Sequence, residues 1–156
     1  MKISAKKIFV LGLIIFLLIQ FYQPARNVSS EQDMPEDFTN VYAVPKNVAT
    51  ILRTSCYDCH SNNTEYPWYS NIQPVRMFMD NHIKEGKENL NFSEFGNYSK
   101  RKQTNKLEEI VKQIKADEMP LASYTLIHRN TLLSTTQKKE VIDWIYTRKD
   151  SISRGY

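Results

Sequence analysis

Apolar residues recur at helical spacing in four separate segments of this 156-residue chain. Residues three and four positions apart lie on the same face of a helix, so each segment predicts a helix with one apolar face. The predicted helices span residues 47–55, 74–85, 104–116 and 134–148. Strands half-buried in a sheet would instead alternate apolar and polar residues, and such alternation is hard to find in this sequence. The pattern therefore predicts an all-α fold.

Individual residues predict where some of these helices begin and end. Pro74 suits the first turn of its helix, where a missing N–H costs nothing. Gly86 is expected to end that helix, because glycine readily adopts the conformation that closes a helix. Ser134 and Gln137 have the spacing of a capping box, which predicts that the last helix begins at Ser134.

The N-terminus has the pattern of an export signal. Lys2, Lys6 and Lys7 precede a nearly unbroken apolar run over residues 8–19, which matches a positive region followed by a hydrophobic region. The run is shorter than the roughly 20 residues of a comfortable membrane span. No clear small-residue cleavage site follows it. We therefore expect residues 1–24 to be an uncleaved signal anchor with its lysines inside, and a cleaved signal is the alternative.

The remainder divides by composition. Residues 25–45 are polar and contain two prolines, which predicts a spacer between the membrane and the folded part. The predicted helices place the folded domain at 46–148. Residues 149–156 are then a C-terminal tail.

Charge and glycine content exclude some classes of function. The net charge is only +4, and the 17 acidic residues are interleaved with the 21 basic ones over most of the chain. A nucleic-acid-binding surface is therefore not predicted. Only 4 glycines are present, which argues against a glycine-rich nucleotide loop and against a turn-rich β-sandwich.

The strongest chemical signal is the pentapeptide Cys56-Tyr57-Asp58-Cys59-His60. It matches C-x-x-C-H, the attachment sequence for c-type haem. Two thiols on one tight turn can reach the two vinyl groups on one edge of haem, and the adjacent histidine can bind the iron. A covalent haem also adds apolar core to a small domain. The sequence thus predicts one covalent haem c, with Cys56 and Cys59 as attachment points and His60 as iron ligand.

Two other uses of the cysteine pair compete with this prediction. An exported chain meets an oxidising compartment, so the pair could form a disulfide. The βαβ pattern that accompanies thioredoxin-like motifs is missing, however. A zinc site would need further cysteines or histidines at ligand spacing, and none completes a set of four.

The sixth iron ligand has several candidates. Met119, followed by Pro120, lies after the third predicted helix, and a methionine thioether from such a loop commonly binds haem iron opposite histidine. Packing in the core is the alternative role for Met119. His82 or His128 would give bis-histidine ligation, and an open position would permit peroxide or gas chemistry.

An aromatic cluster follows the attachment motif closely. Trp68 and Tyr69 could pack on the face or edge of the haem and donate hydrogen bonds to a propionate. The same cluster could equally serve as ordinary core, so it supports haem binding without establishing it.

The chain resembles a bacterial haem-binding domain family found widely in Bacteroidetes-type genomes. The similarity covers about residues 45–148, and several distinct blocks occur in the family's order. These blocks are Cys56–Asn63, Tyr66–Ile72, Pro74-Val75, Gly86, Leu90–Phe95, Met119-Pro120, Tyr124, His128, Leu133-Ser134 and Trp144. The sequence departs from the pattern at Phe95, where a tryptophan is expected. The resemblance implies a c-type haem domain that is anchored or secreted, and it does not settle a reaction.

The sequence as a whole predicts a small, cytochrome c-like helical domain wrapped around one haem. Its expected function is electron transfer between redox protein partners on the periplasmic side of the inner membrane, after anchoring by residues 1–24 or, alternatively, after secretion. A haem peroxidase-like enzyme and a redox or gas sensor are the rival functions. The identity and exchangeability of the sixth ligand separate them.

Overall fold

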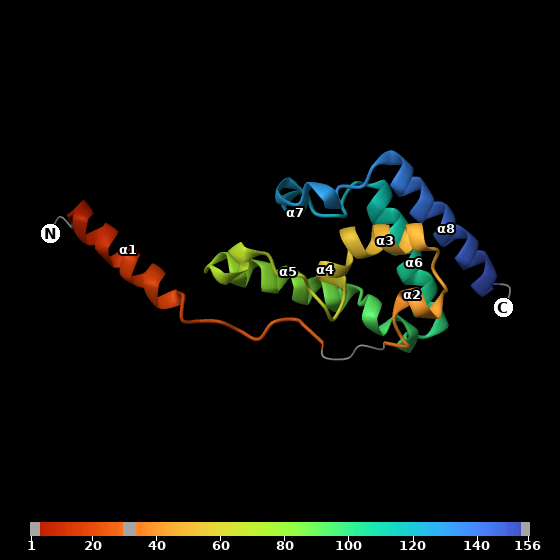
Figure 1. Ribbon diagram of the computed structural model, residues 1–156, viewed down its shortest axis with the longest axis horizontal. Helices are drawn as coiled ribbons and strands as arrows, with labels where there is room; N and C mark the ends of the chain where they lie inside the picture. The colour runs from red at the N-terminus through yellow and green to blue at the C-terminus, as the bar shows by residue number, and fades with distance from the viewer. Residues whose placement is uncertain (1–3, 30–33, 154–156) are drawn as a thin grey trace.

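The computed structural model describes residues 4–29 and 34–153, and within these residues the regular structure is helical (Figure 1). Only an isolated bridge between Val28 and Asn63 has β geometry in this part of the chain. The α-helices are α1 (Ala5–Ile19), α2 (Phe38–Val41), α3 (Lys46–Ser55), α4 (Tyr57–His60), α5 (Val75–Asn89), α6 (Lys100–Lys115), α7 (Ala122–Ile127) and α8 (Thr135–Ser153). Three 3-10 turns join them, η1 (Trp68–Asn71), η2 (Phe92–Asn97) and η3 (Arg129–Thr131). The predicted all-α class is confirmed.

Helices α3, α6 and α8 form the main packing layer, and their apolar faces are the predicted ones. Helix α6 buries Leu107, Ile110, Val111 and Ile114. It begins at Lys100, four residues before the predicted start, because the Ser99 side chain accepts a hydrogen bond from the Lys102 amide at 3.3 Å and caps the first turn.

The capping box predicted for α8 is present. The Ser134 amide donates to the Gln137 side-chain oxygen at 2.9 Å, and the Gln137 amide donates to the Ser134 hydroxyl at 3.2 Å. Helix α8 continues to Ser153, beyond the predicted end at Arg148. Residues 149–153 of the expected tail are thus helical, and residues 154–156 lie outside the described part.

The expectation that residues 25–45 form a spacer that buries little is wrong for the second half of this stretch. Phe38 has no exposed surface, and its ring lies edge-on against Tyr42, Phe95 and Trp144 at centroid distances of 5.3, 4.8 and 5.6 Å. The buried Asp37 side chain caps α2 by accepting from the Thr39 amide at 2.9 Å. The polar composition of the segment did not indicate this element. One fully buried aromatic ring contributes more to packing than its polar neighbours take away.

The first half of the same stretch also contacts the domain. The Asn27 side-chain amide donates to the Ser61 carbonyl at 2.8 Å and to the Thr64 hydroxyl at 2.9 Å. Lys87 of α5 donates to the Asn27 side-chain oxygen at 2.6 Å. These contacts hold residues 25–29 against the domain. Residues 30–33 lie outside the described part of the chain.

Helix α1 extends away from the rest of the molecule (Figure 1). None of its residues is buried, although it is the most apolar segment of the chain. Lys6 and Lys7 lie in its first turn, whereas Lys2 is outside the described residues. Among the described residues, no helix combines the length and hydropathy required to cross a membrane.

Candidate functional site

The two cysteines and His60 lie where α3 ends and α4 begins. Cys56 closes α3 by donating its amide to the Leu52 carbonyl at 2.8 Å, and it also precedes the first residue of α4. The amides of Cys59 and His60 then donate back to the Cys56 carbonyl at 3.3 and 3.0 Å. One short turn therefore carries all three side chains of the predicted motif. Both thiols are free.

Buried Tyr57 fixes α4 against the core. Its ring is stacked on Phe92 at a centroid distance of 4.8 Å, and its hydroxyl donates to Asp37 at 3.1 Å. Burial, with the neighbouring Asp37 charge, raises the pKa of Tyr57 far above its ordinary value. Helix α4 is thus held by both an apolar and a polar contact, although it has only four residues.

The chemistry of the thiols does not suit disulfide exchange. Burial raises the pKa of Cys56 to about 12, and the nearby Cys59 adds to this effect. Burial, with the charge of Asp58, raises the pKa of Cys59 to about 11. Reactive C-x-x-C pairs need a lowered pKa, because the thiolate is the nucleophile.

The His60 ring is held by two backbone carbonyls. Its Nδ1 atom lies 2.9 Å from the Gly86 oxygen and 3.0 Å from the Leu90 oxygen. Carbonyl oxygens only accept, so Nδ1 carries the ring proton and Nε2 keeps its lone pair. Burial lowers the pKa of His60, which favours the neutral ring. A neutral imidazole with a fixed Nδ1–H and a free Nε2 is the usual form of a metal-binding histidine.

Gly86 allows α5 to approach the motif. A Cβ atom at this position would lie 2.6 Å from the Cys59 carbonyl oxygen, which is too close for any side chain. The prediction that Gly86 ends its helix is wrong, since α5 continues to Asn89. The glycine is required by this close contact between helices and not by a helix terminus.

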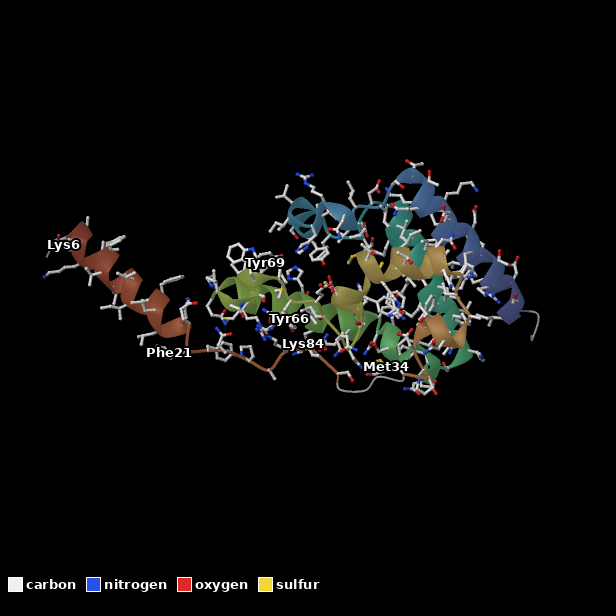
Figure 2. The ribbon with its side chains drawn as sticks, in the orientation of Figure 1. Lys6, Phe21, Met34, Tyr66, Tyr69 and Lys84 are labelled. Atoms are coloured by element: carbon white, nitrogen blue, oxygen red, sulfur yellow. The ribbon has the colours of Figure 1, made fainter. Side chains whose placement is uncertain are left out.

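A pocket with a cavity volume of about 120 Å³ adjoins Cys59. This volume is below the roughly 300–1,000 Å³ of typical cofactor sites, so a haem would have to push the walls of the pocket apart. Helix α5 supplies one wall and helix α7 the opposite wall, while Tyr69 lies between them (Figure 2). The apolar lining residues are Pro67, Val75, Phe78, Met79, Ile83, Leu121 and Ile127.

Hydrogen bonds join α7 to the other side of this pocket. The Tyr124 hydroxyl donates to the Asp58 carboxylate, and burial with this contact raises the pKa of Tyr124 far above its ordinary value. Tyr69 hydrogen-bonds to Nε2 of His128, whose ring is stacked on Tyr124 at a centroid distance of 4.4 Å. Helix α7 is therefore fastened across the pocket by polar contacts.

The predicted site residues are distributed unequally around this pocket. Cys59, Tyr69 and His82 line it. Cys56 and His60 belong to the same turn as Cys59 but are not among its lining residues. Trp68 is 77% exposed and is not a lining residue of the pocket.

Met119 is half-buried and does not line the pocket, although Leu121, two residues later, does. His128 stays outside the lining and binds Tyr69 instead. His82 lines the pocket, and its Nδ1 atom lies 2.9 Å from the Phe78 carbonyl oxygen, which leaves Nε2 free.

Some contacts between residues of the site were not predicted from the sequence. Asp58 and Tyr124 are 66 positions apart, and no local pattern indicates that they meet. Gly86 did carry a signal, because a glycine in a chain with only four predicts a close backbone approach as well as a helix end. In the described part of the chain, no group of three or more cysteine, histidine or acidic side chains could hold a metal ion alone, so the zinc alternative gains no support.

Comparison with known proteins agrees with this geometry at the level of the family. The model of the haem-binding domain family matches residues 14–147, which is most of the chain. No curated protein and no solved structure matches. The matched region begins within α1 and ends within α8, so it includes the cysteine turn, both carbonyls that hold His60 and both walls of the pocket. The chain therefore belongs to the haem-binding domain family.

Proposed function

We propose that the chain carries one covalently attached haem and transfers single electrons. Cys56 and Cys59 would each add S–H across a vinyl group, forming a thioether without consuming an oxidant. His60 would bind the iron through Nε2. The observation that carries the proposal is the position of His60, because two backbone carbonyls fix its Nδ1–H immediately beside two free thiols.

The residues present fit this cofactor. The donor set is two free thiols and one imidazole, which is the set that c-type attachment uses. Haem is a flat, largely apolar molecule, and the pocket beside Cys59 has an almost wholly apolar wall. The absence of a side chain at Gly86 allows α5 to lie against the attachment turn.

Electron transfer is the simplest use of such a site. Bound haem supplies a one-electron Fe(III)/Fe(II) couple. The chain would exclude water with the side chains of α5 and α7, and would restrict movement of α7 through the bond from Tyr124 to Asp58. Histidine ligation, burial and nearby dipoles would then set the reduction potential.

For the sixth ligand we propose Met119, with His82 as the alternative. The Met119 loop leads directly into the pocket wall at Leu121, and a thioether ligand would raise the potential. His82, in contrast to Met119, lines the pocket itself and is therefore the alternative sixth ligand. Ligation by this histidine would lower the reduction potential. In neither case is an open iron site expected, which favours electron transfer over peroxidase or gas-sensing chemistry.

We further propose that α1 anchors the domain on the periplasmic side of the inner membrane, where redox proteins would be its partners. The support is that α1 is apolar around its whole circumference and exposed along its length, with Lys6 and Lys7 at one end. Its 15 residues rise about 22 Å, which is less than the hydrocarbon core of about 30 Å. Local thinning of the bilayer and extended lysine side chains could accommodate this mismatch.

Spectroscopy and kinetics of the haem-loaded protein test the proposed function. We expect the reduced protein to exchange electrons rapidly with a small redox protein, to bind carbon monoxide poorly and to turn over little peroxide. Met119→Ala should lower the reduction potential and allow carbon monoxide to bind the iron. His82→Ala should change neither the reduction potential nor the binding of carbon monoxide. The reverse pattern would identify His82 as the sixth ligand. Ready binding of carbon monoxide by the unaltered protein would instead favour an enzyme or a sensor.

A further inference from the structure

Large apolar side chains surround the mouth of the pocket and face solvent. Trp68 is 77% exposed, Phe78 61% and Leu126 64%, and Val75 and Ile127 are also exposed. We call these five residues the mouth patch. Contiguous exposed apolar surface on a small domain usually marks a site of contact with another molecule or a membrane.

Pocket lining and a ring contact bring Val75, Phe78, Ile127 and Trp68 together, and Leu126 precedes Ile127 in the chain. Val75, Phe78 and Ile127 line the same pocket from opposite walls. Trp68 packs edge-on against Tyr69 at a centroid distance of 5.9 Å, and Tyr69 hydrogen-bonds to His128, which follows Leu126 and Ile127 directly. Bound haem would cover the lining residues, but Trp68 and Leu126 lie outside the lining and would stay exposed.

The mouth patch lies in sequence segments without negative charge. Residues 66–79 and 119–139 contain no aspartate or glutamate, although 17 acidic residues occur elsewhere in the chain. Exposed Arg129 follows Ile127 by two residues, whereas Asp58 and Glu65 line the pocket from other segments. Apolar side chains with a tryptophan and a nearby cation are suited to the boundary between lipid headgroups and acyl chains.

The chain also connects this surface firmly to α1. The Gln73 amide donates to the Gln20 side-chain oxygen at 2.9 Å, and the Gln20 side chain donates to the Gln73 carbonyl at 3.2 Å. The fully buried Gln73 side chain donates in turn to the Tyr22 carbonyl at 2.6 Å. Gln73 lies two residues before Val75, so the end of α1 is fastened beside the patch. Figure 2 shows Tyr69, at the pocket, at the end of the folded domain that is nearer to Phe21 and α1.

We propose that the mouth patch docks on the surface of the lipid bilayer in which α1 is anchored, so that the haem pocket opens at the membrane interface. This inference rests on the proposed anchoring by α1. The bonds between Gln20 and Gln73 hold the domain in one orientation with respect to the membrane. Electrons would then enter or leave at the bilayer surface, which selects partners that are themselves in or on the membrane.

Photolabelling of the haem-loaded full chain tests this orientation. The protein is reconstituted in vesicles of phosphatidylcholine and phosphatidylglycerol that contain a phospholipid with a diazirine in its acyl chain. Adducts are then mapped by mass spectrometry. We expect lipid adducts on α1 and on residues 66–79 and 119–132. Tyr146, which is exposed on α8 and belongs to another surface, should carry none.

Two matched variants sharpen the result. Leu126→Glu should reduce labelling of the mouth patch at least fivefold while α1 remains labelled and the haem spectrum is unchanged. Tyr146→Glu adds the same charge elsewhere and should leave all labelling unchanged. Labelling of α1 without labelling of the mouth patch would overturn this inference and leave the anchor standing. Absence of lipid adducts from both α1 and the mouth patch would overturn the proposed anchor as well. Adducts between two protein chains at the mouth patch would overturn this inference and identify a protein interface instead.

Discussion

The Nδ1 atom of His60 and the carbonyl oxygen of Gly86 lie 2.9 Å apart, in a place where α5 nearly touches the backbone of the cysteine turn. One glycine thus serves two purposes. Its missing side chain allows the approach to Cys59, and its carbonyl orients the histidine ring. The family's attachment motif is consequently only half of the site, and the other half comes from a helix that starts fifteen residues later.

Substitution of Gly86 should damage the site through packing. In Gly86→Ala the new methyl group would meet the Cys59 carbonyl at 2.6 Å, so α5 or α4 must shift. We expect a loss of about 1–3 kcal/mol in the free energy of unfolding. The matched control is Gly12→Ala, where no atom lies within 4 Å of the new methyl. Urea denaturation of both variants checks this, and equal stability of the two would contradict the packing argument.

The bond from Tyr124 to Asp58 should stabilise α7 across the pocket. In Tyr124→Phe the Asp58 carboxylate loses a hydrogen bond from a half-buried hydroxyl. We expect a cost of about 1.5–3 kcal/mol, the range for bonds to charged groups. Tyr146→Phe is the control, because its hydroxyl bonds to Lys115 on the exposed surface and should contribute less than about 0.5 kcal/mol. Amide hydrogen exchange of residues 122–127 would show whether α7 is the part that loosens.

The buried ring of Phe38 tests whether residues 34–45 belong to the folded domain. Phe38→Ala should lower the free energy of unfolding by about 3–5 kcal/mol, because it leaves a cavity among Tyr42, Phe95 and Trp144. Phe21→Ala removes the same ring from a position that is 86% exposed and should have little effect. A spacer would show no difference between these variants in thermal or urea unfolding.

Helix periodicity in the sequence was sufficient to predict the longer helices but not the short elements around them. Leu107, Ile110, Val111 and Ile114 predicted α6 because burial of one face dominates the energetics of an amphipathic helix. The same reasoning failed for Phe38, where a single four-residue turn has no period to detect. For the site, Cys56, Cys59 and His60 are adjacent in sequence and were found together. The carbonyls of Gly86 and Leu90 were not, because backbone groups leave no mark on residue identity.

Stability of the haem-free chain should depend on pH through its two thiols. The folded chain raises the pKa of Cys56 to about 12 and of Cys59 to about 11, from an ordinary value of 9.0. Above pH 9 the unfolded state therefore loses protons that the native state keeps, and stability falls as the pH rises. A Cys56→Ser/Cys59→Ser chain should lack this part of the decline. The check is urea denaturation of both chains at pH 8 and pH 10, and parallel curves would contradict the burial of the thiols.

The spectrum of the denatured protein in alkaline pyridine shows whether haem is covalently attached through Cys56 and Cys59. The full chain is expressed with a c-type maturation system, denatured, and separated from free haem before measurement. We expect a c-type haemochrome that stays with the polypeptide at one haem per chain and that is absent from Cys56→Ala/Cys59→Ala. Haem that separates from the denatured chain, or that is retained equally by the double variant, would contradict covalent attachment.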